Sequence, residues 1–254
     1  MSRELIRRWQ TEAIDFLPTL PALLARTAPV AIPVPVLLGI VAVAAVLSLP
    51  RATWQYFGLF ATLVHELGHA VAAILTGRAV HGIRIRRNHS GEAVSSGRGV
   101  FGTVVSGVFG YPAPAIVGAA QLWSVFNGYT AIVLFTGGIV LVLTLLVIRN
   151  AFGAIVVLVS AATSALLWFR ATPTVQGYAL LVIGIALLVG AVRALCTVIG
   201  AHLRRRDQLS TSDAYLLYRR TGIPSPVWLL LFTMLIGGCC VFAVWSYPVS
   251  NLSP

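Results

Sequence analysis

At residues 61–70 the chain reads Ala-Thr-Leu-Val-His-Glu-Leu-Gly-His-Ala, which contains the pattern His-Glu-x-x-His. On a helix, His65 and His69 lie four residues apart, so both imidazoles project from one face and can bind one metal ion. Glu66 follows the first histidine directly and places beside that ion a carboxylate that can accept and return a proton. Because apolar residues flank the pattern on both sides, we predict a metal centre on an apolar helix.

The composition is typical of a membrane protein. Of the 254 residues, 58% are hydrophobic and 10% are charged, and the mean hydropathy is +0.90. A soluble domain of this length needs more charge to cover its surface. All 18 basic residues are arginines, and they lie mainly between the apolar runs. This placement favours contact with the lipid bilayer over contact with nucleic acid, so we expect a multi-pass protein of a cell membrane.

We predict an all-α fold with about seven transmembrane helices. Several apolar runs are long enough to cross a hydrocarbon core, and the expected spans are 32–49, 53–75, 103–123, 129–148, 151–169, 176–200 and 227–247. The first 30 residues mix charged and apolar positions and contain prolines, which is typical of an amphipathic segment at the interface. Residues 31–248 then form a single transmembrane domain with an inner loop at about 201–226. The sequence does not indicate an oligomeric state.

The arginines also predict how the chain is oriented. With the N-terminus in the cytoplasm, the inner segments contain most of the arginines, whereas the outer loops contain only Arg51 and Arg170. An excess of arginine on the cytoplasmic side is the usual arrangement in membrane proteins. The motif then lies in the inner half of the second span.

Between the second and third spans the pattern changes from apolar to alternating. Residues 80–87 alternate, residues 88–91 favour a turn, and residues 92–102 can return as a second strand. We therefore expect a small β-hairpin at about 79–102, on the membrane surface. The hairpin either packs on headgroups through its arginines or offers a strand edge that holds a substrate in an extended conformation.

The third span is interrupted by Gly110-Tyr111-Pro112-Ala113-Pro114. Two prolines within three residues predict a kink or an unwound turn, which is tolerated at membrane depth where protein or a watery cavity satisfies the freed backbone groups. The break is either a simple kink or a wall of the site. Tyr111 either packs there or donates a hydrogen bond to a developing oxyanion.

A catalytic zinc site usually has three protein ligands, so the two histidines need a partner. Beyond the N-terminal segment, the other candidates are Glu92, Asp207, Asp213, His81, His89 and His202. We favour Asp213, because Ser212 can cap a helix that has this carboxylate in its first turn. Asp207 follows three arginines and is more typical of a solvated counter-charge. Glu92 and the three histidines also stay open as candidates for the third ligand.

His65-Glu66-Leu67-Gly68-His69-Ala70 on an apolar helix resembles the site-2-protease class of intramembrane metalloproteases. The order of features is similar to that of the compact M50B-type branch: motif helix, hairpin, residues 110–115, and then Ser212-Asp213-Ala214 followed by residues 221–224. The resemblance covers about residues 50–230. It implies a zinc endopeptidase that cleaves a peptide bond in or next to a membrane-spanning protein substrate. It also implies that His65, His69 and Asp213 bind Zn²⁺ and that Glu66 is the catalytic base.

The chain also departs from site-2 proteases. It has no Asn-x-x-Pro-x-x-x-Leu-Asp-Gly run and no PDZ-like insertion. The first absence keeps the third ligand open, and the second indicates a different way of selecting substrates. Two other functions are compatible with the pattern: a non-proteolytic metal-binding transporter or permease, and an inactive scaffold that sequesters membrane partners. The intact Glu66 argues against the scaffold.

Overall fold

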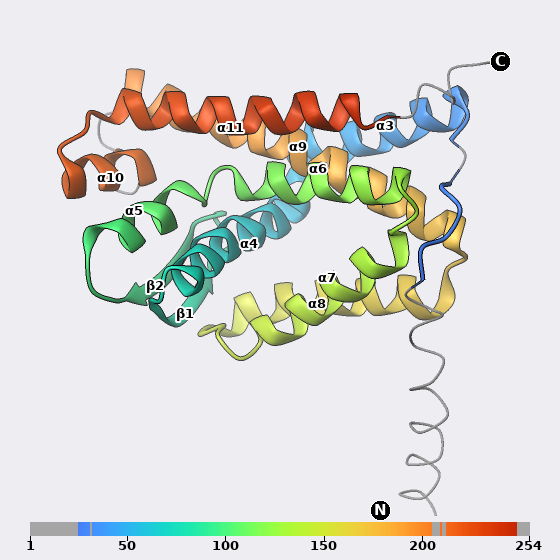
Figure 1. Ribbon diagram of the computed structural model, residues 1–254, viewed down its shortest axis with the longest axis horizontal. Coiled ribbons are helices and arrows are strands. Elements are labelled where there is room, and N and C mark those ends of the chain that lie inside the picture. The colour runs from blue at the N-terminus through green and yellow to red at the C-terminus, as the bar shows by residue number, and fades with distance from the viewer. Residues whose placement is uncertain (1–24, 31, 205–208, 210–211, 248–254) are drawn as a thin grey trace, which may run out of the picture.

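The computed structural model describes residues 25–30, 32–204, 209 and 212–247. Most of these residues are helical, and the elements are α3 (Val34–Ser48), α4 (Arg51–Leu75), β1 (Ala79–Ile85), β2 (Gly91–Ser96), α5 (Val100–Val108), α6 (Ala113–Phe126), α7 (Thr130–Thr144), α8 (Ala151–Arg170), α9 (Pro173–Arg204), α10 (Asp213–Thr221) and α11 (Ser225–Trp245). Figure 1 shows their arrangement. Most of the predicted interfacial segment, residues 1–24, lies outside the described residues.

Among the described residues, four helices are long and apolar enough to cross a membrane, namely α4, α8, α9 and α11. The pair α5 and α6 meets the same criterion but bends by 61° at the predicted break, which gives five candidate spans if the pair counts as one. The prediction of seven spans is therefore not confirmed. The other two expected spans are represented by α3 and α7, which have 15 residues each. Helices of that length measure about 22 Å, which is less than the roughly 30 Å of a hydrocarbon core.

Helix α7 is short because the residues after it pair with the hairpin instead. The Ile83 N–H donates to the carbonyl oxygen of Val147, and the Arg149 N–H donates to the carbonyl oxygen of Ile83, both at 2.8 Å. The side chain of Asn150 adds two hydrogen bonds to the backbone of Ile85, at 3.1 and 2.7 Å. Part of the apolar run that predicted a helix to residue 148 is thus extended backbone along β1.

Both strands of the hairpin lie along α4, and the position of the hairpin at the membrane surface stays a prediction. Its strands are antiparallel. At its turn, the His89 Nε2 lies 3.1 Å from the carbonyl oxygen of Gln55, and the Thr62 hydroxyl donates to the carbonyl oxygen of His89 at 3.3 Å. Gln55 precedes the end of α4 at Leu75 by twenty residues, which is about 30 Å of helix. The predicted second strand also ends early, at Ser96, and α5 begins at Val100.

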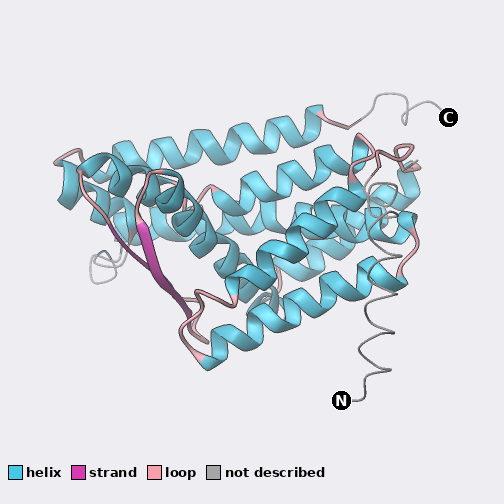
Figure 2. Cartoon of the chain, turned by 60° about the horizontal axis from the view of Figure 1, so that its bottom comes forward, coloured by secondary structure: helices cyan, strands magenta, loops and turns pink. Residues whose placement is uncertain are grey.

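The largest buried cluster joins α3, α6, α9 and α11, and its members include Leu181, Phe232 and Val125. Figure 2 shows helices of the bundle side by side, with both strands toward one end. Helices α6 and α9 approach each other closely, so that a Cβ atom added to Gly118 would overlap the carbonyl oxygen of Gly184. Small residues commonly let membrane helices pack this closely.

We expect Gly118→Ala to destabilise the fold, because the new methyl group would force the α6 and α9 backbones apart. Overpacking of this kind costs about 1–3 kcal/mol. The matched control is Gly137→Ala in α7, where an added Cβ meets nothing within 4 Å. The control should be neutral or slightly stabilising, since alanine favours helix by about 1 kcal/mol over glycine. Thermal unfolding in detergent micelles measures both, and equal midpoints for the two variants would contradict the assignment.

Candidate metal centre

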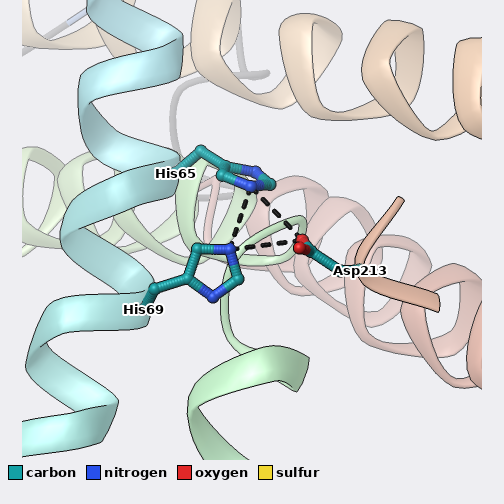
Figure 3. Close-up of side chains that lie close together, drawn as sticks. All are labelled: His65, His69 and Asp213. Atoms are coloured by element: carbon teal, nitrogen blue, oxygen red, sulfur yellow. Dashed lines mark hydrogen bonds and ion pairs between the residues drawn. The ribbon is translucent and has the colours of Figure 1, made fainter. Parts of the chain in front are cut away.

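Three side chains from two distant segments converge at one point. Helix α4 presents His65 and His69 on one face, and Asp213 at the start of α10 faces them (Figure 3). The two histidine Nε2 atoms are 3.1 Å apart. The Asp213 Oδ2 lies 3.3 Å from the His65 Nε2 and 3.2 Å from the His69 Nε2. The three atoms therefore form a nearly equilateral triangle.

This triangle has the dimensions of one face of a zinc coordination sphere. Ligand atoms at about 2.0–2.1 Å from a tetrahedral zinc ion lie about 3.3 Å from one another. The Asp213 Oδ2 is buried and has no hydrogen bond of good geometry, although both Nε2 atoms are close to it. A cation placed between the three atoms would stabilise this close approach. The two imidazoles and one carboxylate thus fit a metal ion, and they form the one such cluster found among the described residues.

The other candidates for the third ligand are engaged elsewhere or lie outside the described residues. Glu92 is paired with Arg86 at 3.5 Å. The His81 Nε2 lies 2.6 Å from the Ser96 hydroxyl, and His89 belongs to the hairpin turn. The His202 Nδ1 contacts its own helix at 3.0 Å. Asp207 is outside the described residues.

Asp213 reaches the site because α10 packs its buried face against α5. Ala214 and Leu217 are buried, and the Leu217 side chain lies against Gly107. The helix begins at Asp213 as predicted, but Ser212 at the N-cap position makes no side-chain capping hydrogen bond. Burial raises the pKa of the Asp213 carboxyl, but the neighbouring imidazoles outweigh this effect and hold the pKa below its usual range. The carboxylate form, which can bind a cation, is therefore favoured.

Helix α5 fixes the orientation of His69. The His69 Nδ1 lies 2.6 Å from the carbonyl oxygen of Ser106, and the Ser106 hydroxyl donates to the carbonyl oxygen of His69 at 2.9 Å. When the Nδ1–H donates to a carbonyl, the lone pair of Nε2 remains free for a metal ion. The sequence analysis did not identify Ser106, because nothing in its local pattern marks it as a partner of a residue 37 positions earlier.

The break between α5 and α6 forms a wall of the site. A Cβ atom added to Gly110 would overlap the His69 ring and come within 2.9 Å of the Asp213 Oδ2. On α4, a Cβ atom added to Gly68 would overlap the carbonyl oxygen of Phe109. The Tyr111 ring stands nearly perpendicular to the His65 ring, with centroids 4.9 Å apart. The break was expected to be either a simple kink or a wall of the site, and the structure supports the wall.

Glu66 lies beside the three candidate ligands and is 4% exposed. A Cβ atom added to Gly91, at the start of β2, would overlap the Glu66 carboxylate, so the hairpin approaches this side chain closely. Glu66 and the three candidate ligands line a common cavity of about 930 Å³. Residues 90–95 along β2, together with Tyr111 and Pro114, line the same cavity.

The comparison with protein families gives one match. The model described as Peptidase M50B-like matches residues 38–244, which is most of the chain, so the chain belongs to this family. Membership implies a membrane metallopeptidase of the site-2-protease type and confirms the resemblance seen in the sequence. No curated protein and no solved structure matches the chain.

We expect Gly110→Ala to weaken metal binding, because the new methyl group displaces the His69 ring and the Asp213 carboxylate. The matched control is Gly200→Ala in α9, where an added Cβ meets nothing within 4 Å, so zinc content should stay at the wild-type level. Zinc content after purification in detergent is the measurement. Full zinc occupancy in Gly110→Ala would show that the break does not constrain the ligands.

Proposed function

We propose that this protein is a zinc-dependent intramembrane endopeptidase that cleaves a peptide bond in or next to a membrane-spanning protein substrate. The observation that carries the proposal is the near-equilateral triangle of His65, His69 and Asp213 ligand atoms, with the Glu66 carboxylate on the same cavity. Membership in the Peptidase M50B-like family supports it. The candidate ligands lie on or beside α4, which is long enough to cross a membrane.

Each residue has a distinct role in the proposed reaction. His65, His69 and Asp213 hold Zn²⁺, which when bound polarises the peptide carbonyl and acidifies water. Glu66 accepts a proton from the attacking water and later donates it to the leaving amine. The buried position of Glu66 excludes competing hydrogen bonds from bulk water. Ser106 keeps the Nε2 of His69 directed at the centre through its carbonyl.

The free edge of β2 is the proposed binding surface for the substrate. Consecutive residues 90–95 line the cavity, which is the pattern of a strand edge, since a strand face exposes alternate residues. The partner strand β1 pairs with β2 on one side and with Val147 and Arg149 on the other. A substrate strand added to β2 would pass Gly91 and so bring its backbone next to Glu66. Helical backbone resists attack, and strand addition provides the extended conformation.

Water reaches the site in this proposal through the break between α5 and α6. Ser106, Gly107, Tyr111 and Pro114 lie along this break, and all of them line the cavity. The arginine distribution predicts that this face is cytoplasmic, with the N-terminus on the same side. The orientation remains a prediction.

We expect Glu66→Gln to retain zinc and to lose peptide hydrolysis by about 100- to 10,000-fold, the usual contribution of a general base. The assay uses wild-type and variant protein in detergent with a panel of labelled apolar peptides that contain helix-breaking residues. The matched control is Glu92→Gln, because Glu92 lines the cavity but is paired with Arg86.

This experiment also separates the peptidase from the transporter. A metal-binding transporter or permease would keep its flux in Glu66→Gln as long as the metal site is intact. Hydrolysis by Glu66→Gln at the wild-type rate would contradict the role of Glu66 as base. Zinc uptake into vesicles that persists in this variant, without any hydrolysis by the wild type, would favour the transporter.

A further inference from the structure

A second, smaller cavity opens beside the C-terminal end of β2 and contains two arginines. Its volume is about 270 Å³, and it is lined by Arg78, Arg220, Ser96, Thr103, Gly97, Gly99 and Val100. No acidic residue lines it, and in the described part of the chain no carboxylate pairs with either arginine. Among the described residues, the cavity is therefore a concentration of positive charge without a paired carboxylate.

The position of Arg78 is defined by its neighbours. Its Nε donates to the Ser95 hydroxyl at 3.3 Å, one terminal nitrogen donates to the Thr103 hydroxyl at 2.9 Å, and the other donates to the carbonyl oxygen of Ser95 at 3.3 Å. Gly97 and Gly102 leave the space that its aliphatic stem fills, since added Cβ atoms would come within 2.8 and 2.9 Å of it. Two of its five N–H groups remain for a ligand.

The small cavity adjoins the cavity of the metal centre. Arg78, Thr103 and Arg220 line both of them. Strand β2 runs from one cavity to the other. Gly91 at its start lies against the Glu66 carboxylate, and the carbonyl oxygen of Ser95 near its end accepts a hydrogen bond from Arg78. A strand rises about 3.3–3.4 Å per residue, so the contact of Arg78 at Ser95 lies four residues along β2 from the contact of Gly91 with Glu66. The cavity that contains Arg220 begins one residue further, at Ser96.

We propose that Arg78 and Arg220 bind a carboxylate side chain of the substrate, about four to five residues from the peptide bond that is cleaved. This inference rests on the proposed function, because the substrate strand must run along β2 with its reacting carbonyl near Glu66. Guanidinium groups bind carboxylates through paired hydrogen bonds, and both arginines present such donors to the same space. Because both arginines also line the cavity of the metal centre, a group of the substrate is favoured as their ligand over the phosphate of a lipid headgroup.

The test uses two series of apolar peptides. One series carries a single glutamate that is moved to successive positions, and the other carries glutamine at the same positions. Binding is measured first with full-length Glu66→Gln protein, which holds the peptide without turnover. We expect the glutamate peptide to bind about tenfold more tightly at the favoured position, as is usual for a charge-assisted hydrogen bond. Arg220→Gln in the same background should remove the preference.

Arg219→Gln is the matched control. Arg219 is the neighbouring exposed arginine on α10, and it lines neither cavity. The preference for glutamate should therefore persist in this variant. Arg220 is the main test because it is exposed, whereas Arg78→Gln also removes hydrogen bonds that connect β2 and α5.

Three results would overturn the inference. They are equal binding of the two series at every position, a preference that survives Arg220→Gln, and a preference that Arg219→Gln also removes. Binding to phosphatidylglycerol vesicles that requires Arg220, with equal binding of the peptide series, would assign the cavity to lipid phosphate instead.

Cleavage of the same peptides by the wild type distinguishes this inference from the proposed function. Absence of cleavage together with a glutamate preference in binding would contradict the peptidase but not the carboxylate site. Cleavage that depends on Glu66 without any preference would contradict only the carboxylate site.

Discussion

The structure depends on one arrangement, in which the carboxylate of Asp213 lies against the imidazoles of His65 and His69 from a distant part of the chain. Asp213 follows His69 by 144 residues, yet its Oδ2 lies within 3.3 Å of both Nε2 atoms. Three polar groups at such distances are costly inside an apolar protein unless a cation or a proton network stabilises them. A metal ion that binds all three atoms would provide that stabilisation, and it would do so only if the helices hold their present positions.

Several features around the site are explained by this requirement. The break between α5 and α6 allows the backbone of Gly110 to lie against His69 and Asp213, which no residue with a side chain permits. The break costs hydrogen bonds that a continuous helix would keep, and such breaks persist in membranes where they line a cavity. Ser106, one turn before the break, orients His69. The irregular part of the third predicted span therefore forms a wall of the candidate metal centre.

The hairpin places its polar backbone beside a helix that is long enough to cross a membrane. Exposed strand edges are unfavourable in lipid, because their N–H and C=O groups have no partner there. Here one outer edge is covered by residues 147–149, and the other lines the large cavity. Only the cavity edge remains to pair with another chain. This arrangement links the position of the hairpin to the extended substrate that we propose.

Local patterns in the sequence predicted much of this structure. The break at residues 110–114 follows from its prolines, the motif helix ends at residue 75 as predicted, and Asp213 lies in the first turn of α10 as predicted, although Ser212 makes no capping hydrogen bond. What the sequence could not predict depends on distant contacts. Residues 145–148 look helical by hydropathy, but pairing with Ile83 makes part of them extended. The local sequence does not show why Gly91 and Gly110 matter, because their importance lies in the side chains that pack against them.

The most direct test of the central claim is the zinc content of purified protein in detergent, compared between the wild type, His65→Ala and Asp213→Ala. The account predicts about one zinc ion per chain in the wild type, with loss of zinc in both variants while the helical content stays unchanged. Full zinc occupancy in Asp213→Ala would contradict the three-ligand centre, even if His65→Ala had lost the metal.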